Sequence, residues 1–277
     1  MSDDVLLDKR DGVGVITLNR PDSLNAMGGR LLPMLGEFLA ECEDDREVRC
    51  VALTGAGRGF CAGGDVKNMQ SRNDGNSRGT AERGSAFFVS HLERQAEELR
   101  RWHDSTTLKM HTMAKPVVGL INGVAVGAGL SLALATDIRI ASERARFGTA
   151  FRNVALSGDF GGTYLLPRLI GMGKARELFF TGEIINADKA LEIGLVNQVI
   201  PHDDLMTTGF EFCRKLAQGP TATLGRIKAN LNRGETGTLK ETLDQEAFLQ
   251  RFSGLAADSR EAVRAFMERR EPAFTGE

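Results

Sequence analysis

The sequence predicts an α/β fold with a helical C-terminal part. Two strands followed by a helix recur about three times in the first two hundred residues, and residues 205–267 are almost wholly helical in pattern. The composition, 42% hydrophobic and 26% charged, is that of a globular protein and argues against disorder. Strands that alternate with helices favour an α/β architecture over a β-sandwich or a helical bundle.

The first repeat is the clearest. Residues 12–18 (GVGVITL) predict a strand that ends at the turn-prone sequence NRPD. Residues 31–43 carry apolar side chains at helical spacing and predict an amphipathic helix. Residues 49–54 (RCVALT) predict a second strand, which leads into a glycine-rich segment at 55–64.

The middle of the chain repeats this pattern with longer insertions. Residues 70–80 are polar and predict a loop, and residues 82–106 predict a long, charged helix. A helix of small residues is predicted at 125–135. Three further strands are predicted at 116–121, 137–141 and 146–148.

Charge and composition exclude several classes of function. A net charge of −2 over 277 residues gives no sign of nucleic-acid or anionic-membrane binding. The N-terminus lacks the layout of a signal peptide, and no apolar run reaches the length of a membrane span. The four cysteines and four histidines have no metal-ligand spacing. We therefore expect a reduced, cytoplasmic protein without a metal.

Two segments share one design, an apolar strand followed by small residues and a helix, at residues 51–66 and 117–138. Small residues at such turns let a ligand approach backbone N–H groups. Neither segment matches a dinucleotide-binding fingerprint, because Phe60 and Leu132 stand where it needs a small residue. A Walker phosphate loop is also absent. From glycine content alone, tight packing of helix on sheet remains an alternative to a ligand site.

The motifs GRGFCAGGDV (57–66) and KPVVGLINGVAVGAGLSLALATDI (115–138) resemble the two oxyanion segments of the crotonase (enoyl-CoA hydratase/isomerase) superfamily. Further matches in the family's order are 18–26, FGGTYLLPRLIG (160–171), TGEIINADKALEIGLVNQVI (181–200) and AFMERREPAF (265–274). The resemblance implies an α/β crotonase-like spiral of repeated ββα units over residues 1–200. It also implies a helical C-terminal region at 201–277 for trimerisation and CoA contact.

By this resemblance the oxyanion hole is formed by the backbone N–H groups of Ala62 and Ala128. Enolate formation moves charge onto a thioester carbonyl oxygen, and fixed N–H donors stabilise that charge more than the ground state. The alternative for both alanines is that they are small packing residues.

The resemblance also implies a binding site for CoA. Asn25 and Ala26 are expected to border the CoA together with the glycine-rich turn after the second strand. A basic residue of the terminal helix is expected to reach the nucleotide phosphates, often of a neighbouring subunit, although a solvated charge is the alternative there. The residues concerned are Asn25, Ala26, Gly64, Asp65, Val66, Arg269 and Arg270.

The sequence departs from the family where hydratases carry two glutamates that hold a water molecule. Ser131 and Phe151 occupy these places, and neither can act as an unaided general base. We expect Ser131, Phe151 and Phe160 to line the acyl pocket instead. Hydration by the two-glutamate route is therefore not expected.

One acid remains, Asp159, in the segment LSGDFGG (156–162). This segment resembles that of family members that shift a double bond within an enoyl-CoA with a single carboxylate, which removes a proton and returns it further along. The alternative is that Asp159 caps a helix that begins near Thr163. His91 and His103, on the long helix, either assist or are simply solvated. Cys61 is interpreted as a buried filler and not as a nucleophile.

The leading functional prediction is enoyl-CoA double-bond isomerisation with Asp159 as acid and base. Three alternatives stay open: a hydratase with atypical residues, another enolate-forming reaction such as thioester hydrolysis, dehalogenation or decarboxylation, and a non-catalytic acyl-CoA-binding protein. The expected partner is an acyl-CoA thioester, without nucleic acid or membrane, and no cofactor is expected beyond the coenzyme A of the substrate. The resemblance implies a homotrimer or a dimer of trimers.

Overall fold

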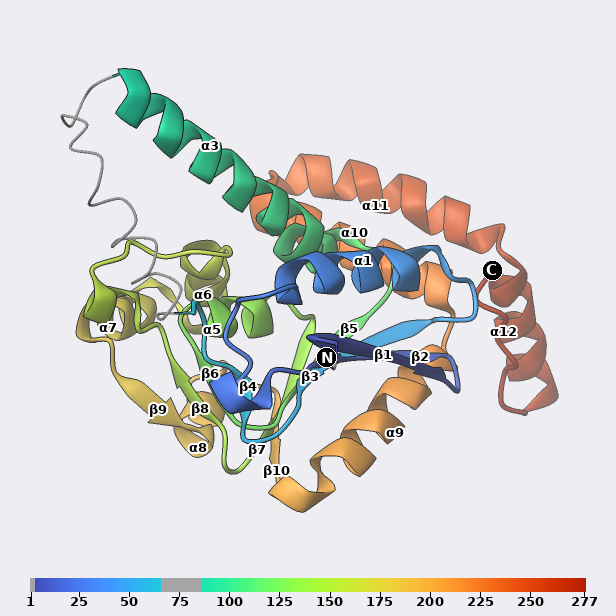
Figure 1. Cartoon of the computed structure of the whole chain (residues 1–277). Coiled ribbons are helices and arrows are strands. Elements are labelled where there is room, and N and C mark those ends of the chain that lie inside the picture. Colours follow the sequence, from blue (N-terminus) through green and yellow to red (C-terminus); the bar gives the residue numbers. More distant parts are fainter. Residues whose placement is uncertain (1–2, 66–85) are drawn as a thin grey trace.

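Two β-sheets form the centre of the protein (Figure 1). The computed structural model describes residues 3–65 and 86–277. The larger sheet contains, in spatial order, β1 (Val5–Arg10), β2 (Val13–Leu18), β3 (Cys50–Gly55), β5 (Val117–Ile121), β7 (Ile138–Ser142) and β10 (Gln198–Ile200). The smaller sheet contains β4 (Gly59–Cys61), β6 (Val124–Val126), β8 (Arg146–Gly148) and β9 (Ile184–Asn186).

Three successive strand pairs generate a spiral. In each pair, β3 and β4, β5 and β6, or β7 and β8, the first strand joins the larger sheet and the second joins the smaller one. Within each sheet the three strands run parallel. The predicted fold class, a spiral of ββα units, is therefore confirmed.

Helices surround the two sheets (Figure 1). A π-helical turn at Asp104–Leu108 joins α3 to α4. The helices are α1 (Leu31–Asp44), α3 (Ala86–His103), α4 (Lys109–Thr112), α5 (Ala128–Leu134), α6 (Gly162–Ile170), α7 (Met172–Thr181), α8 (Ala187–Glu192), α9 (Leu205–Ala217), α10 (Thr221–Thr236), α11 (Leu239–Gly254) and α12 (Ala257–Glu268).

The central strands of the larger sheet, β2, β3, β5 and β7, are buried on both faces, which explains why they are nearly continuously apolar. Successive side chains of a strand point to opposite faces. Accordingly, Val51 and Leu53 of β3 belong to the core between the sheet and α1. Cys50 and Ala52 belong to a second core between the sheet and α9. The α1 core is the larger one and extends to α5 and α6, so it is continuous with the region where the two glycine-rich turns meet.

The sequence prediction differs from the structure in the second glycine-rich segment. Residues 125–135 were expected to be helical throughout, but Ala125 lies in β6, where it pairs with Cys61 of β4 and Phe147 of β8. The helix begins only at Ala128. A three-residue strand is too short to show a period of two, so pairing with neighbouring strands decides its conformation. The loop expected at 70–80 lies outside the described residues.

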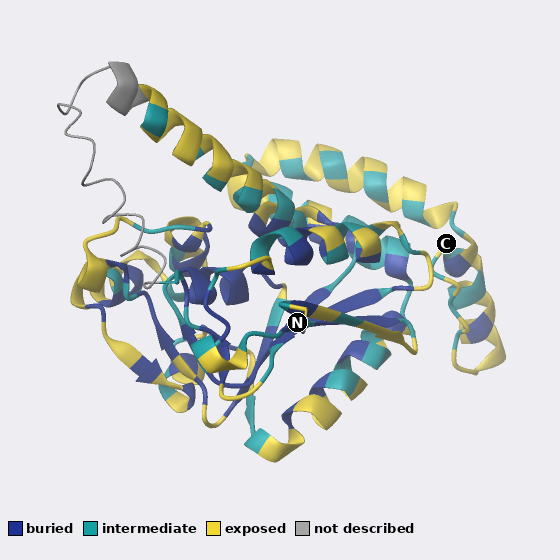
Figure 2. Cartoon of the chain, viewed as in Figure 1, coloured by how far each residue is buried: buried dark blue, intermediate teal, exposed yellow. Residues whose placement is uncertain are grey.

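The C-terminal helices reach outward from the sheets. Lys228 anchors α10 by donating to the Met110 carbonyl at 2.6 Å and to Asp137 Oδ2 at 2.9 Å. Burial lowers the pKa of Lys228 and raises that of Asp137, so the two groups depend on each other for charge neutralisation. In contrast, α11 and α12 are largely exposed (Figure 2). Across the described residues, the structure contains no helix both long and apolar enough to span a membrane.

Candidate active site

The two glycine-rich turns meet backbone to backbone at one edge of the smaller sheet. Because β4 and β6 are parallel neighbours, the turns that follow them lie side by side. A methyl group on Gly63 would lie 2.8 Å from the Val126 carbonyl oxygen and 3.3 Å from Ala128 N. Gly63 (φ +84°) and Gly127 (φ +56°) both adopt the left-handed region that favours glycine. Gly63 is therefore required for this close approach, whereas Gly127 is favoured by its backbone conformation.

The amides of the first turn have different hydrogen-bond partners. The prediction that Ala62 supplies an oxyanion donor is wrong, because its N–H donates to the Leu24 carbonyl at 2.9 Å and is not available to a ligand. The Gly63 N–H donates to the thiol of Cys61. Within residues 3–65 and 86–277, the N–H groups of Gly64 and Ala128 have no hydrogen-bond acceptor. Gly64 and Ala128 therefore carry the available donors.

Asp159 lies in the turn before α6 and is held through one carboxylate oxygen. Its Oδ1 accepts from His103 Nε2 at 2.6 Å and from the Phe160 N–H at 2.8 Å. The helix-capping alternative is wrong, because Gly161 is the N-cap of α6 and no side chain caps this end. Sequence reasoning gave no reason to pair Asp159 with His103, since 56 residues separate them.

The end of α3 is fastened to the same turn. The ring of His103 meets that of Phe160 edge-on, with centroids 4.8 Å apart. Thr107, in the π-helical turn, donates through Oγ1 to the Phe160 carbonyl at 3.3 Å. Phe160 is buried and adopts φ +48°, an uncommon conformation for a bulky residue. π-Helical turns and such backbone conformations occur often at functional sites.

Ser131 connects the second glycine-rich turn with the turn that carries Asp159. Its hydroxyl is buried and lies 3.4 Å from the Gly127 carbonyl, and a methyl group on Gly162 would lie 2.5 Å from Ser131 Oγ. Asp159 and Ala128 are thus on two turns joined through Ser131 and Gly162. This arrangement brings a carboxylate into the same region as the Ala128 amide, which has no acceptor among the described residues.

Phe151, the second position at which hydratases carry glutamate, is an apolar packing residue. It is buried and stacks on Phe179 with ring centroids 6.3 Å apart and an interplanar angle of 16°. Ser131 and Phe151 therefore bring no carboxylate to the region, as the sequence predicted.

Asn25, expected to border the CoA, has a structural role instead. Its side chain is fully buried; Oδ1 accepts from Arg20 N at 2.7 Å, and Nδ2 donates to the carbonyls of Ala56 and Gly59. The prediction of a contact between Asn25 and the ligand is therefore wrong. The amide joins the turn after β2 to the loop between β3 and β4.

The neighbouring candidates for CoA binding lie close to Gly64. The Ala26 carbonyl accepts from Arg20 Nη1 at 2.6 Å, and Asp65 Oδ2 lies 3.5 Å from Arg20 Nη2. Gly64 pairs with Met27 in an isolated parallel β-bridge, in which the Met27 N–H donates to the Gly63 carbonyl at 2.7 Å and the Gly64 N–H takes no part. This bridge holds the turn beside the segment that contains Ala26. Val66 lies outside the described residues.

The two arginines at the end of α12 differ in their contacts. Arg270 forms ion pairs with Glu261 and Glu268, both at 2.6 Å, and its hydrogen bonds lower the pKa of Glu261 to about 2. Arg269 has no such ion pair within residues 3–65 and 86–277. Helix α12 lies at the far end of the molecule from α5 and α6 (Figure 1). These arginines therefore do not reach the site of their own chain.

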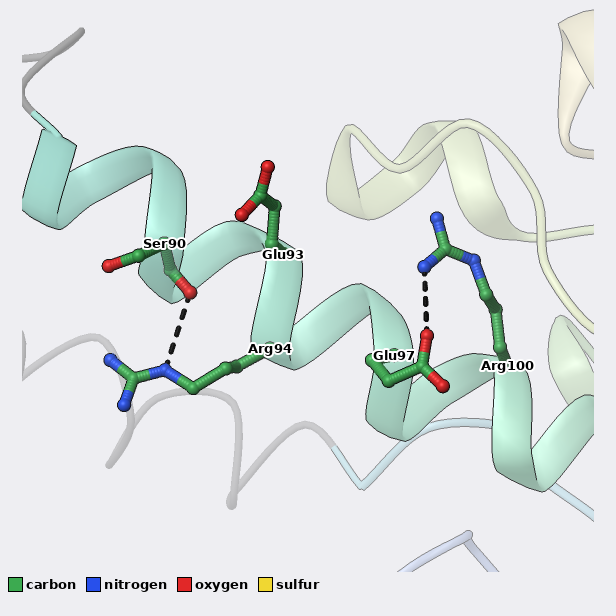
Figure 3. A pocket seen from close by; sticks show the side chains of 5 residues that line it. All are labelled: Ser90, Glu93, Arg94, Glu97 and Arg100. Carbon is green, nitrogen blue, oxygen red and sulfur yellow. Dashed lines mark hydrogen bonds and ion pairs between the residues drawn. The ribbon is translucent and has the colours of Figure 1, made fainter.

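A groove of about 700 Å³ along α3 is unrelated to this site. Figure 3 shows its lining side chains spread along one helix. Its polar contacts follow the helix, with Arg94 Nε donating to the Ser90 carbonyl at 3.3 Å and Arg100 Nη1 to Glu97 Oε2 at 3.1 Å. Such pairs on a solvated helix face contribute little to stability.

Cys61 lies beside these turns but is not an activated nucleophile. Full burial raises the pKa of its thiol to about 12. We expect iodoacetamide at pH 8 to leave Cys61 unmodified in the folded protein, since a thiol of that pKa is ionised to about one part in ten thousand. Mass spectrometry of tryptic peptides, with and without urea, measures this. Alkylation of Cys61 in the native protein at the rate seen in urea would contradict it.

Comparisons with known proteins identify the family to which the chain is similar. A family model described as enoyl-CoA hydratase/isomerase matches residues 8–277. The chain is 40% identical over 276 residues to 1,2-epoxyphenylacetyl-CoA isomerase of Escherichia coli, with all of both chains covered. It is 36% identical to a short-chain-enoyl-CoA hydratase of Clostridium acetobutylicum, covering 96% of this chain and 95% of the relative. An enoyl-CoA hydratase from Bacillus anthracis superposes with a TM-score of 0.85 at 32% identity, covering 99% of this chain and all of the other.

Proposed function

The chain belongs to the enoyl-CoA hydratase/isomerase family, and we propose that it isomerises the double bond of an enoyl-CoA with Asp159 as the acid and base. The observation that carries this proposal is the arrangement around Asp159. This carboxylate is fixed through Oδ1 beside the two glycine-rich turns, whereas Ser131 and Phe151 supply no second carboxylate. One acid is enough to move a proton from one carbon to another.

The oxyanion hole in this proposal consists of the N–H groups of Gly64 and Ala128. They replace the pair Ala62 and Ala128, because the Ala62 N–H is bonded to Leu24. A donor of this kind typically contributes about 3–4 kcal/mol when charge develops on the carbonyl oxygen. Neither donor requires a side chain, which is consistent with the small residues at these positions.

The reaction proceeds in two proton transfers. Asp159 takes a proton from the carbon between the thioester carbonyl and the double bond, so a C–H bond breaks and an O–H bond forms. The electron pair moves onto the carbonyl oxygen, where the two amides stabilise the dienolate. Protonated Asp159 then returns the proton to the carbon at the far end of the conjugated system. The carboxylate is regenerated and nothing is consumed.

Hydration would require more catalytic groups than isomerisation. A water molecule must be held, deprotonated and added while a second group protonates the neighbouring carbon. The hydroxyl of Ser131 is a weak base without a partner, and its nearest acceptor is the Gly127 carbonyl of its own helix. Because neither Ser131 nor Phe151 supplies a carboxylate to work with Asp159, isomerisation is favoured.

We further propose that the protein acts in the cytoplasm as a homotrimer or a dimer of trimers, with no cofactor beyond the coenzyme A of its substrate. Large apolar side chains on α12 and directly after α11 support the assembly. Phe266 is 81% exposed and Leu255 is 74% exposed, an unusual state for side chains of this size in an isolated subunit. In such an assembly Arg269 would approach the CoA phosphates of a neighbouring subunit.

The test is incubation with 3-enoyl-CoA and, separately, with 2-enoyl-CoA in deuterated water, followed by mass spectrometry of the thioesters. We expect interconversion of the two isomers with deuterium at the α or γ carbon. A product heavier by one water would instead identify a hydratase. Binding of both thioesters without exchange or conversion would identify an acyl-CoA-binding protein, and both results would overturn the proposal.

A further inference from the structure

We infer that His103 is a positioning residue, which fixes Asp159 through Oδ1 so that Oδ2 is the oxygen that exchanges protons with the substrate. The inference rests on the proposed function, because it assigns separate tasks to the two oxygens of the proposed acid and base.

The hydrogen bonds to Asp159 are concentrated on one oxygen. Oδ1 accepts from His103 Nε2 at 2.6 Å and from the Phe160 N–H at 2.8 Å. Within the described residues, nothing donates to Oδ2. An ionised carboxylate only accepts hydrogen bonds, so Nε2 of His103 must carry the proton in this pair. Two donors from different directions fix the torsion of the carboxylate and leave Oδ2 as the free base.

His103 is itself held in place. Its ring packs edge-on against Phe160, and the π-helical turn that follows brings Thr107 against the Phe160 carbonyl. His103 and Thr107, four residues apart, thus contact two adjacent residues of one turn. The side chains of His103 and Asp159 are 33% and 26% exposed, so the pair is partly shielded from water but remains accessible to a ligand.

A purely structural role for this contact makes a different prediction. If His103 only fastened α3 to the Asp159 turn, its loss would lower stability and leave the turnover of folded protein unchanged. If His103 aims Oδ2, its loss lowers kcat while KM stays the same, because substrate binding does not depend on the direction of the carboxylate. An error of about 1 Å in the position of a reacting group can cost about 10²-fold in rate.

The experiment compares His103→Leu, His103→Gln and His103→Asn in the isomerisation assay. Leucine removes the donor, glutamine places an amide N–H near the position of Nε2, and asparagine is too short to reach. We expect His103→Leu and His103→Asn to lower kcat about 10- to 100-fold at unchanged KM, and His103→Gln to recover most of the loss. Arg100→Ala, an exposed position one turn earlier on α3, is the matched control and should keep wild-type kcat.

Thermal unfolding of each variant separates folding from positioning. Should His103→Leu not fold, the contrast between glutamine and asparagine, both polar and neutral, still decides the question. Equal kcat in those two variants, a wild-type kcat in His103→Leu, or a rise in KM alone would overturn the inference. Absence of deuterium exchange in the wild-type protein would overturn the proposed function itself, so the two failures are distinguishable.

Discussion

Asp159→Asn is expected to lower kcat for double-bond isomerisation by about three orders of magnitude, the middle of the range of about 10²- to 10⁴-fold that general acid–base catalysis contributes. The substitution nearly preserves shape. The asparagine Oδ1 can still accept from His103 and the Phe160 N–H, so the turn before α6 should keep its conformation. An amide nitrogen then stands where Oδ2 was, and it cannot accept a proton. The loss should therefore appear in kcat with little change in KM or in the thermal unfolding temperature.

The measurement follows conversion of 3-enoyl-CoA to the conjugated 2-enoyl-CoA by absorbance, together with deuterium incorporation by mass spectrometry. Asp104→Asn is the matched control, because it removes the same charge from an exposed position next to His103. We expect this control to turn over like the wild-type protein. If Asp159→Asn retained the wild-type rate of isomerisation, Asp159 would not be the acid and base, and another residue would have to transfer the proton.

More of the fold than of the candidate site could be predicted from the sequence. Strands of five or six residues, such as β3 and β5, show their burial in their composition, whereas β4 and β6 have three residues each and depend on pairing across the sheet. Repetition of the strand–strand–helix pattern was enough to indicate an α/β fold, and the resemblance to the crotonase superfamily indicated the spiral. The helix boundary at Ala128 was not predictable, because Ala125 is drawn into the smaller sheet by its neighbours.

In the site, local sequence indicated Asp159 because it stands in a glycine-flanked turn of a matched segment. The sequence did not indicate which amide of the first glycine-rich turn is available. The available amide is determined by Leu24, a residue distant in sequence, whose carbonyl accepts a hydrogen bond from the Ala62 N–H. The pairing of His103 with Asp159 depends likewise on a π-helical turn, which the hydrophobic periodicity of the sequence does not predict. Contacts between distant segments determine these details, and a single sequence does not record them.

Gly63→Ala is expected to lower kcat by about 10²-fold, the loss typical of one misplaced oxyanion donor. The added methyl group would lie 2.8 Å from the Val126 carbonyl oxygen and 3.3 Å from Ala128 N. Because both neighbours are backbone, the two turns must separate, and this would move apart the Gly64 and Ala128 amides, which form the oxyanion hole in the proposed mechanism. The substitution also strains a residue at φ +84°, so some loss of stability should accompany the loss of rate.

A second glycine separates these two consequences. Gly171 has φ +79°, nearly the value at Gly63, but a methyl group there would meet nothing within 4 Å. Gly171→Ala therefore strains the backbone, at φ +79° and ψ +152°, without pushing any neighbouring group aside, and we expect a lower unfolding temperature with wild-type kcat. The comparison requires kcat, KM and thermal unfolding for both variants. Equal kcat in the two variants would mean that the separation of the turns does not matter for catalysis. The oxyanion would then have to be stabilised by donors other than Gly64 and Ala128.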